Sequence, residues 1–574
     1  MEKCGMFTFS RKKLFFNQPW KMEVDPFDIF ERNKLWEIAE DESRPTDVSP
    51  PYWHRINVPG CWNTQRKELE YYEGSAWYYN RFNFSRRPNV KYILYFEAAN
   101  YRTKVWLNKK FAGENEGGFT PFYFDVTQHL QDDNVIIVKV ENTRNEDNVP
   151  TLIFDWFNFG GITRPVYIFP VAETFIKNYK VSTRIDAGRT IAKFEVWIDG
   201  KEPPTSATVS MPDVKFTGIV PLRKGYGAAE FEINPILWTP ERPQLYTVEV
   251  FTEGDRIEDL VGFREIRVEG DEILLNGKPI FLRGVCVHEE TEERGRTLTM
   301  RDVVDRLDAA KHLNCNFLRL AHYPHTELMA RKADSLGIML WEEIPVYWLI
   351  KFEHSSVLPK AKHQMQQLVE RDWNRASVII WSVQNETHPG KARNKFLSSL
   401  VDRTRELDGS RLVSSACILT TDKYGSPVID DPLTAKYDVV GLNEYYGWYE
   451  KTPEDLAPFA NQRSVNKPII ITETGAGALH AHHGPKTERF TEEYQADFHE
   501  RQINVLDKMP RIRGICPWLL FDFRSPLRTN RFQKGYNRKG LMDRHGKRKA
   551  AFRVYQRYYA EKAGNRNIPR IAEK

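Results

Sequence analysis

The pattern of apolar residues changes near residue 269, and this change constrains the fold of the chain more than any other sequence feature. Beyond it, short apolar runs alternate with segments of helical periodicity, and eight runs have the length of buried strands. They are Ile280–Val287, Cys315–Leu320, Ile338–Trp341, Val378–Val383, Leu412–Cys417, Asp438–Leu442, Pro468–Ile471 and Gly514–Leu519. Eight strand-and-helix units in this length fit a (β/α)8 TIM barrel, which we predict over residues 269–574.

Helix signals between these runs support the barrel. Thr299-Met-Arg-Asp302 has the spacing of a capping box, and Val303, Leu307 and Ala310 follow on one face. A second periodic segment carries Phe396 inward and ends at Gly409. Both segments therefore predict helices that cover the barrel strands.

The first 268 residues read instead as short strands and turns. Runs such as Tyr92–Glu97, Thr103–Asn108 and Val135–Val140 are separated by Gly-, Asn- and Asp-rich joints. Residues 1–170 predict a jelly-roll β-sandwich, and residues 171–268 predict an immunoglobulin-like β-sandwich. The predicted fold class is therefore multidomain, with two N-terminal β-sandwiches followed by the barrel.

Composition excludes several classes of function. The 83 Lys and Arg against 78 Asp and Glu give a formal charge of +5, which is too small for a nucleic-acid surface on a chain of 574 residues. No run approaches the ~18 apolar residues of a membrane helix. The six cysteines are far apart, so no metal site, cofactor or disulfide framework is expected. The expected location is the cytoplasm, or the periplasm if an export signal was removed.

Two glutamates occupy matching positions in this pattern. Glu386 follows the apolar run that begins at Val378, and Glu473 follows the run that begins at Pro468. Functional side chains of TIM barrels lie at the carboxyl ends of the strands. We therefore expect the two carboxyl groups to face one another across one cavity.

The other predicted strand ends carry more polar and aromatic side chains. They are His288, Glu289, Glu290, Arg319, His322, Glu342, Glu343, Asn385, Asn443, Glu444, Tyr445, Tyr449, Trp518 and Asp522. Paired carboxylates with an aromatic floor are typical of glycoside hydrolysis, in which one acid protonates the leaving oxygen and the other stabilises the sugar cation. Pairing with Arg319 would explain one of the adjacent Glu342 and Glu343 without chemistry.

The chain resembles glycoside hydrolase family 2 over nearly its whole length. The resemblance rests on Asn385-Glu386 ending one strand, on Glu473 ending the third strand later, and on two β-domains ahead of a barrel. Within the family it resembles the bacterial β-glucuronidases, through three motifs. These are Asp155-Trp-Phe-Asn-Phe-Gly, Asn443-Glu-Tyr-Tyr-Gly-Trp-Tyr449 and Asn537-Arg-Lys-Gly540.

This resemblance implies a role for each residue. Glu386 would be the general acid and then the base, and Glu473 the nucleophile of a retaining mechanism. Asn537 and Lys539 would bind the sugar carboxylate. The remaining substrate-binding residues would be Asp155, His288, Asn385, Asn443, Tyr445, Tyr449 and Trp518, with Asn385 at the sugar 2-hydroxyl and Tyr445 beside the nucleophile.

Two departures from the β-glucuronidase pattern stand out. The segment from Tyr347 to Arg371 is short, so the long active-site loop of some bacterial members is absent and an open mouth is expected. After the first strand the chain has Val287-His-Glu-Glu290, where those enzymes place Arg before His and Asp at the fourth position. The second departure leaves glucuronate and galacturonate unresolved.

The leading prediction is a retaining, exo-acting β-glucuronidase whose partner is a carbohydrate with a terminal uronic acid. The alternatives are a β-galacturonidase or a β-galactosidase of the same family. A carbohydrate-binding protein without catalysis is the non-enzyme alternative, and it need not keep both Glu386 and Glu473. The two sandwiches could equally serve as assembly surfaces, which leaves a homo-oligomer open.

Overall fold

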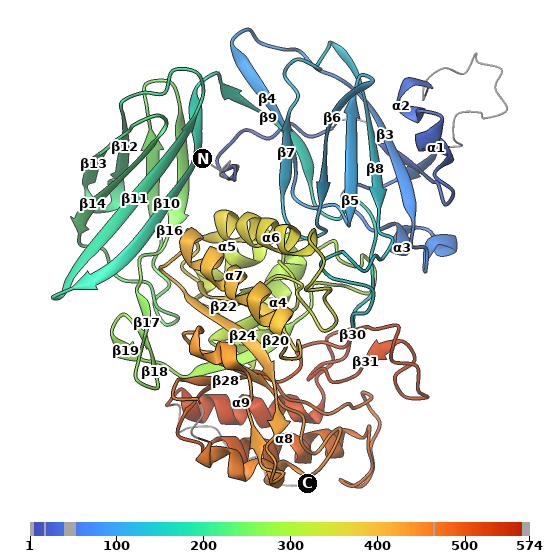
Figure 1. Cartoon of the computed structure of the whole chain (residues 1–574), viewed down its shortest axis with the longest axis vertical. Helices are drawn as coiled ribbons and strands as arrows, with labels where there is room; N and C mark the ends of the chain where they lie inside the picture. The colour runs from blue at the N-terminus through green and yellow to red at the C-terminus, as the bar shows by residue number, and fades with distance from the viewer. Residues whose placement is uncertain (1–4, 17–18, 39–52, 463–464, 565–574) are drawn as a thin grey trace.

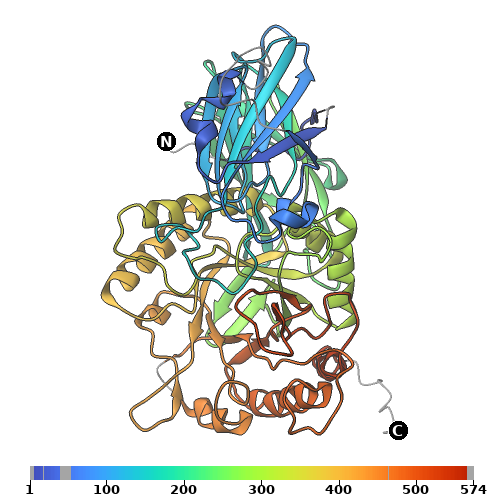
Figure 2. The same cartoon turned by 90° about the vertical axis from the view of Figure 1, so that its right-hand side faces the viewer.

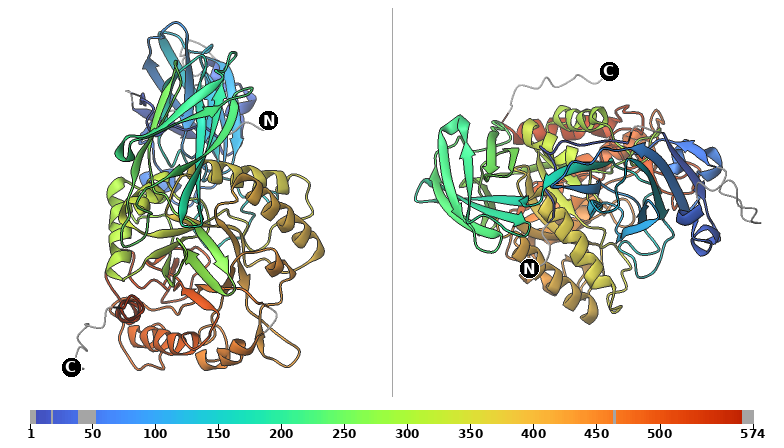
Figure 3. Two further views of the ribbon diagram at one scale, coloured as in Figure 1. Left: turned by 90° about the vertical axis from the view of Figure 1, so that its left-hand side faces the viewer. Right: turned by 90° about the horizontal axis from the view of Figure 1, so that it is seen from above.

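The computed structural model describes residues 5–16, 19–38, 53–462 and 465–564 of the chain. Two β-sandwiches lie next to each other on one side of a barrel that carries the C-terminal half (Figure 1). From above, the second sandwich lies at one end of the molecule and the first at the other (Figure 3). The predicted fold class is confirmed.

The first sandwich consists of a six-stranded and a three-stranded antiparallel sheet. The larger, in the order β2-β1-β3-β8-β5-β6, contains β1 (Trp20–Val24), β2 (His54–Ile56), β3 (Ser75–Asn83), β5 (Arg102–Leu107), β6 (Lys110–Glu116) and β8 (Asp133–Glu141). The smaller contains β4 (Val90–Phe96), β7 (Phe122–Asp125) and β9 (Val166–Ala172). The short helices are α1 (Ile29–Arg32), α2 (Leu35–Ile38), α3 (Trp62–Gln65) and η1 (Lys67–Leu69). Large apolar side chains from both sheets form its core.

The second sandwich packs a three-stranded sheet on a four-stranded one, as expected for an immunoglobulin-like domain. Its strands are β10 (Phe175–Asp186), β11 (Arg189–Asp199), β12 (Ser206–Met211), β13 (Phe216–Pro221), β14 (Tyr226–Ile233), β15 (Tyr246–Phe251) and β16 (Arg256–Val261), with η2 (Pro212–Val214). Alternate residues of β16 are buried, as expected for a strand in a sheet that has one face exposed to solvent. A small sheet of β17 (Ile266–Glu269), β18 (Glu272–Leu275) and β19 (Lys278–Pro279) leads into the barrel.

All eight predicted barrel strands are present and form a closed parallel barrel. They are β20 (Leu282–Val287), β21 (Phe317–Leu320), β22 (Met339–Glu343), β23 (Val378–Asn385), β24 (Leu412–Ile418), β27 (Val440–Asn443), β28 (Ile469–Glu473) and β29 (Ile512–Ile515). The largest difference from the prediction is at the last strand, which begins before Gly514 and ends at Ile515. Trp518 therefore lies in the loop after the strand rather than in it.

Helices and short strands complete the barrel. They are α4 (Met300–His312), α5 (Glu327–Leu336), α6 (Val357–Asp372), α7 (Lys391–Leu407), α8 (Glu492–Leu506), α9 (Ala550–Lys562), η3 (Pro432–Ala435), η4 (Pro453–Asn461), β25 (Thr420–Thr421), β26 (Pro427–Val428), β30 (Phe523–Arg524) and β31 (Tyr536–Asn537). The predicted capping box at Thr299 and Asp302 is confirmed at the start of α4. Among the described residues, no helix has the length and hydrophobicity needed to cross a membrane.

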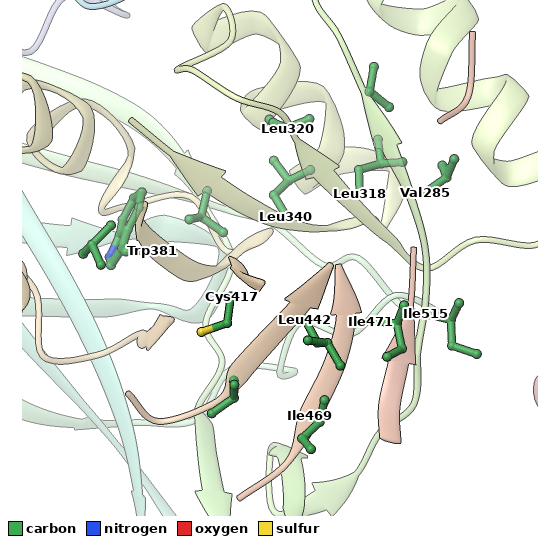
Figure 4. Close-up of a cluster of buried hydrophobic side chains, with 14 of the residues drawn as sticks. Val285, Leu318, Leu320, Leu340, Trp381, Cys417, Leu442, Ile469, Ile471 and Ile515 are labelled. Atoms are coloured by element: carbon green, nitrogen blue, oxygen red, sulfur yellow. The ribbon is translucent and has the colours of Figure 1, made fainter. Parts of the chain in front are cut away.

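The barrel core lies between the strands and the surrounding helices. Figure 4 labels residues of this cluster on all eight strands, among them Val285, Leu340 and Ile515. These side chains pack against helix residues such as Leu307 and Leu400, while their neighbours along the strands form a second buried cluster. Burial on both faces explains why the strands read as continuous apolar runs.

Both sandwiches are attached to the barrel through buried polar contacts. Arg164 of the first sandwich forms an ion pair of 2.6 Å with Glu289, which follows β20. On the other side, the indole nitrogen of Trp373 donates to the Tyr179 carbonyl oxygen at 2.8 Å. The segment that carries β30 and β31 lies below α3 of the first sandwich (Figure 2), where Arg524 pairs with Glu70 at 2.8 Å. Both sandwiches therefore contact the barrel directly.

Candidate active site

A pocket of ≈ 640 Å³ opens where the barrel strands end. The loops after β22, β23, β27, β28 and β29 line it, together with Asp155 from the first sandwich. Every site residue predicted from the sequence lines this pocket except His288 and Asn385. Those that do are Asp155, Glu386, Asn443, Tyr445, Tyr449, Glu473, Trp518, Asn537 and Lys539. The structure therefore brings both acids and the predicted carboxylate-binding pair into one cavity.

Glu386 is the first residue after β23, and both oxygens of its carboxyl group accept hydrogen bonds from neutral donors. Asn443 Nδ2 donates to Oε1 at 2.9 Å, and Trp348 Nε1 donates to Oε2 at 2.8 Å. The backbone of Glu386 is left-handed, with φ 52°. A non-glycine residue adopts this conformation when its surroundings impose it, as is common at active sites.

Glu473 is the last residue of β28 and is buried. Its Oε1 accepts a hydrogen bond from Arg319 Nη1 at 2.6 Å, and its Oε2 accepts one from the Tyr445 hydroxyl at 2.6 Å. Burial raises the pKa of Glu473 to about 7, while Arg319 opposes the rise and the charge of Glu386 adds to it. The two glutamates therefore differ in their partners, as two carboxyl groups with different roles should.

Asn385 lies beside the pocket with its amide oriented by its neighbours. Its Oδ1 accepts hydrogen bonds from Arg319 Nη2 at 2.6 Å and from Asn443 Nδ2 at 3.1 Å. Its Nδ2 is buried and has no hydrogen-bond partner among the described residues. A buried donor without a partner is costly, so this amide is suited to a ligand acceptor.

Arg319 connects the two glutamates that end β22 and β28. It donates to Glu343 Oε1 at 3.1 Å as well as to Glu473. The expected buried pairing with one of the two adjacent glutamates is therefore confirmed for Glu343. Its neighbour Glu342 is buried beside Asp372, and burial together with that negative charge raises the pKa of Glu342 well above its usual value. Glu342 accordingly belongs to the core.

One end of the pocket is positively charged. Lys539 is only 2% exposed, and its Nζ donates to the Tyr449 hydroxyl at 2.8 Å. The ammonium lies 5.2 Å from the ring centroid of Tyr445 and 4.9 Å from that of Tyr449. Within the described part of the chain, no carboxylate oxygen lies within 4.0 Å of this ammonium. Lys539 is thus a buried cation without an anionic partner.

Arg528 is a second cation at this end, and the sequence did not single it out. Its Nη2 donates to Asp155 Oδ2 at 2.6 Å, and its Nη1 donates to the Tyr449 hydroxyl at 3.3 Å. Asn537 Nδ2 also donates to Asp155 Oδ2, at 3.2 Å. Burial opposes the effect, but Lys539 and Arg528 together lower the pKa of Tyr449. Positive charge therefore exceeds negative charge around this hydroxyl.

Trp518 and His322 form the floor of the pocket. Trp518 lines the pocket and stacks on His322, with ring centroids 4.8 Å apart and planes 23° apart. His322 Nδ1 lies 2.9 Å from Glu343 Oε1, and burial and Arg319 lower the pKa of this histidine well below its usual value. His288 lies behind Trp518, with its ring stacked on Phe523 at 4.1 Å. The structure therefore places His288 in the layer that supports the floor.

The first of the two glutamates after His288 contacts the first sandwich, and the second contacts β30 within the barrel domain. Glu289 accepts a hydrogen bond from Arg164 at 2.6 Å and another from the Thr326 backbone at 2.6 Å. Glu290 accepts one from the Arg524 backbone at 2.7 Å, and burial raises its pKa to about 7. The unusual sequence after the first barrel strand is therefore explained by contacts with the first sandwich and with β30.

Comparison with known protein families gives two matches along the chain. The family model of the glycosyl hydrolases family 2 TIM barrel domain matches residues 266–563, and that of the family 2 sugar binding domain matches residues 15–172. The first match alone covers more than half of the chain. This chain belongs to glycosyl hydrolase family 2. It is accordingly a glycoside hydrolase.

Curated relatives of this family 2 chain include several β-glucuronidases. It is 27% identical to the β-glucuronidase of Paenibacillus borealis, over 96% of this chain and 98% of the relative. It is 29% identical to the β-glucuronidase of Canis lupus familiaris, over 90% of this chain and 86% of the relative. The family resemblance deduced from the sequence is thus confirmed.

Solved structures share the fold along the whole chain. A β-glucuronidase of Bifidobacterium dentium complexed with coumarin-3-O-glucuronide superposes with a TM-score of 0.85 and 24% identity, over 97% of this chain and 98% of that chain. A family 2 β-galacturonidase of Eisenbergiella tayi bound to galacturonate gives 0.83 and 23%, over 97% and 99%. At these identities the similarity establishes the fold alone.

Sequence reasoning missed some residues of this family 2 pocket. Tyr347, Trp348, Leu349, His388 and Arg528 line it in addition to the predicted set. The position of Trp348, shortly after a predicted strand, is a signal that could have been used. For Arg528 no local signal exists, because the residue lies thirteen positions beyond the end of β29 in an irregular segment.

The histidines of His480-Ala-His-His483 lie away from this site. His480 contacts Glu492 at 3.1 Å, and His483 contacts Glu493 at 2.8 Å. Among the described residues, no group of three or more His, Cys, Asp or Glu side chains has the geometry to hold a metal ion. This tract lies between β28 and α8.

Proposed function

We propose that this enzyme is a retaining, exo-acting β-glucuronidase that removes a terminal β-D-glucuronic acid from a carbohydrate or other glycoside. The observation that carries the proposal is the buried ammonium of Lys539, which lies in the same pocket as Glu386 and Glu473 and has no carboxylate partner among the described residues. The β-glucuronidases among the curated relatives support the same substrate class.

The electrostatics of this end of the pocket favour an anionic sugar. Burying an ammonium costs several kcal/mol unless an anion compensates. A C6 carboxylate beside Lys539 and Asn537 would supply that anion, whereas a neutral CH2OH group would leave the ammonium unpaired. Arg528 lies farther out and already pairs with Asp155. Lys539 is therefore the group that distinguishes a uronide from a neutral glycoside.

The first chemical step would use both glutamates. Glu473, held by Arg319 and Tyr445, attacks the anomeric carbon as the glycosidic bond breaks. The electron pair of that bond passes to the leaving oxygen, which takes the proton of Glu386. The unpartnered Nδ2 of Asn385 would donate to the sugar 2-hydroxyl while charge develops. The product is a covalent glycosyl-enzyme and a released alcohol.

The second step reverses the proton transfer. Glu386, now ionised, removes a proton from water, and the resulting hydroxide attacks the anomeric carbon. The bond to Glu473 breaks and its carboxylate is regenerated. Two displacements on the same carbon give net retention, so the first sugar released is the β-anomer. NMR of the anomeric proton during the first minutes of hydrolysis measures this outcome directly.

Hydrolysis of three aryl glycosides tests the proposal. The purified wild-type chain is assayed on p-nitrophenyl β-glucuronide, β-galacturonide and β-galactoside, and kcat/KM is expected to be highest for the glucuronide. Glu473→Gln should lower kcat by 10³-fold or more, because no nucleophile remains. If activity is highest on the galacturonide, the substrate is galacturonate, the 4-epimer of glucuronate, rather than glucuronate. Inactivity on both uronides would refute the proposal.

A charge variant tests the carboxylate-binding end separately. Lys539→Met should lower kcat/KM on the uronide by on the order of 10³-fold. On the galactoside, kcat/KM of the variant should be at least as high as that of wild type. Lys534→Met removes the same charge from an exposed position in the same segment and serves as the matched control. An equal loss on uronide and galactoside after Lys539→Met would mean that this lysine does not select the acid.

A further inference from the structure

Trp348 holds the proposed acid/base carboxyl from the mouth side of the pocket. Its indole Nε1 donates to Glu386 Oε2 at 2.8 Å, while Asn443 Nδ2 donates to Oε1 at 2.9 Å. The terminal torsion of a glutamate is broad, so a carboxyl group with one donor can still rotate. Asn443 also donates to Asn385 Oδ1, whereas within the described residues the indole N–H of Trp348 donates to Glu386 and to no other acceptor.

The backbone fixes Trp348 next to Glu386. Trp348 N donates to the Asn385 carbonyl oxygen at 3.1 Å, and Asn385 N donates to the Val346 carbonyl oxygen at 2.9 Å. Tyr347 and Asn385 form a parallel bridge, so the loop after β22 extends the barrel ladder along the end of β23. Trp348 and Glu386 both have a left-handed backbone, each with φ 52°. Such strain persists where the surroundings over-determine a functional geometry.

The indole ring is also held in its plane. Tyr347 stacks on it with ring centroids 4.5 Å apart and planes 28° apart. Tyr347 in turn packs edge-on against Trp156 of the first sandwich, at 5.0 Å. Trp156 is 1% exposed and is packed against Phe154, Tyr323 and His322 as well. The direction of the Trp348 N–H is thus set by a stack that begins in another domain.

We propose that Trp348 is a positioning residue, whose indole N–H orients the carboxyl group of Glu386 so that its proton reaches the leaving-group oxygen. The proposal rests on the proposed function, because it takes Glu386 as the acid/base. Trp348 transfers no atom itself. Its contribution lies in the step in which the glycosidic bond breaks, the electron pair passes to the leaving oxygen and the proton of Glu386 follows.

This role predicts a dependence on the leaving group. A weakly basic leaving group such as 2,4-dinitrophenolate departs without a proton, whereas phenolate needs one during bond cleavage. Loss of the orienting N–H should therefore affect phenyl glycosides far more than dinitrophenyl glycosides. A merely structural role would affect both equally. The comparison uses kcat/KM, which reports the first irreversible step, here bond cleavage.

Trp348→Phe is the decisive variant, because it keeps an aromatic ring next to Tyr347 and removes the N–H donor; the smaller ring affects both substrates alike. With phenyl and 2,4-dinitrophenyl uronides, kcat/KM is expected to fall on the order of 10–100-fold for the phenyl substrate. For the dinitrophenyl substrate it should stay within about 2-fold, since no general acid is needed. The ratio of the two values does not depend on the folded fraction of the preparation, so partial misfolding cannot imitate the result.

Trp373→Phe is the matched control. It removes an indole N–H that donates to the Tyr179 carbonyl oxygen at 2.8 Å, at the barrel's contact with the second sandwich. The phenyl-to-dinitrophenyl ratio should stay at the wild-type value in this variant. Equal losses on both substrates after Trp348→Phe, or an unchanged phenyl rate, would overturn the proposal.

The choice of sugar separates this test from that of the function. Both substrates carry the sugar that wild type hydrolyses fastest in the three-glycoside assay. If that sugar is neutral, the proposed β-glucuronidase is refuted, yet the ratio still reports on Trp348. If it is a uronic acid and the ratio does not change, only the role of Trp348 is refuted.

Discussion

At the scale of single residues, the main feature of the candidate active site is that its two carboxyl groups have different surroundings. Glu473 is buried, accepts hydrogen bonds from a guanidinium and a phenol, and has a pKa raised to about 7. Among the described residues, Glu386 accepts hydrogen bonds from two neutral donors, an amide and an indole. The assignment of roles rests on these partners, because Arg319 and Tyr445 hold the ionised form of Glu473 in place for attack, whereas burial alone favours its neutral form.

The raised pKa of Glu473 predicts the acid side of the activity profile. A nucleophilic carboxylate works only when ionised, so kcat/KM should fall as the pH drops through about 7. A plot of log kcat/KM against pH measures this limb for wild type. Full activity persisting down to pH 5 would contradict the assignment.

The same shift predicts a gain in stability from removing the charge. A carboxyl group whose pKa is higher in the folded than in the unfolded state stabilises the fold at pH values below its pKa in the unfolded state. This contribution is lost as the pH rises through about 7, the pKa of Glu473 in the folded state. Glu473→Gln keeps the neutral shape at every pH. The variant should therefore match wild type near pH 4.5 and exceed it at pH 8, by ~2–4 kcal/mol. Denaturant unfolding at both pH values measures the difference, and equal stability at pH 8 would contradict it.

At the scale of secondary structure, the elements that matter are strand ends and helix ends rather than their middles. Gly337 ends α5 in a left-handed conformation with φ 70°, and β22 follows two residues later. A Cβ atom at this position would lie 2.2 Å from the Pro240 carbonyl oxygen of the second sandwich. Glycine here permits both the turn and the close approach of another domain.

Gly337→Ala should therefore be costly beyond its local strain. The left-handed backbone costs a Cβ-bearing residue ~1 kcal/mol, and the clash with a fixed carbonyl oxygen should bring the total to ~3 kcal/mol or more. Gly546→Ala is the matched control, because Gly546 has φ 83° and open space around the added atom. Thermal unfolding of both variants measures the two losses of stability. Equal losses would mean that the backbone at Pro240 can shift at little cost.

At the scale of the whole molecule, the first sandwich belongs to the active site. It supplies Asp155 to the pocket, and Trp156 supports the stack that ends at Trp348. The buried pair of Arg164 and Glu289 attaches this loop region to the barrel. Arg164 also donates to the Phe119 and Pro324 carbonyl oxygens at 2.6 and 2.7 Å. Folding and catalysis are therefore coupled across this interface.

Arg164→Met should lower both the stability of the fold and the affinity for substrate. It leaves Glu289 buried without its cation, which typically costs ~3–5 kcal/mol, and it loosens the segment that presents Asp155. Unfolding should shift to lower temperature, and KM for the uronide should rise in the protein that remains folded. Arg501→Met, which breaks an exposed pair with Glu454, should change stability by less than ~1 kcal/mol. Similar losses in the two variants would argue against a buried connection.

The sequence by itself determined the architecture and most of the chemistry. Apolar runs of strand length, helix caps and acids just after strands are local signals, and in a closed parallel barrel the strand ends necessarily meet. The eight strands, Glu386 and Glu473 could therefore be located without coordinates, whereas Lys539 was singled out only by the resemblance to family 2. The resemblance to family 2 then predicted which of these residues bind the sugar.

Only the tertiary structure decided which distant residues become partners. Arg528 reaches Asp155 across two domains, Arg319 joins two strand ends, and the first sandwich sets the plane of Trp348. The position of His288 behind the floor has the same origin, because Phe523 lies beyond the last strand. Such contacts depend on barrel closure and domain docking, which bring together residues hundreds of positions apart and leave no periodic trace in the sequence.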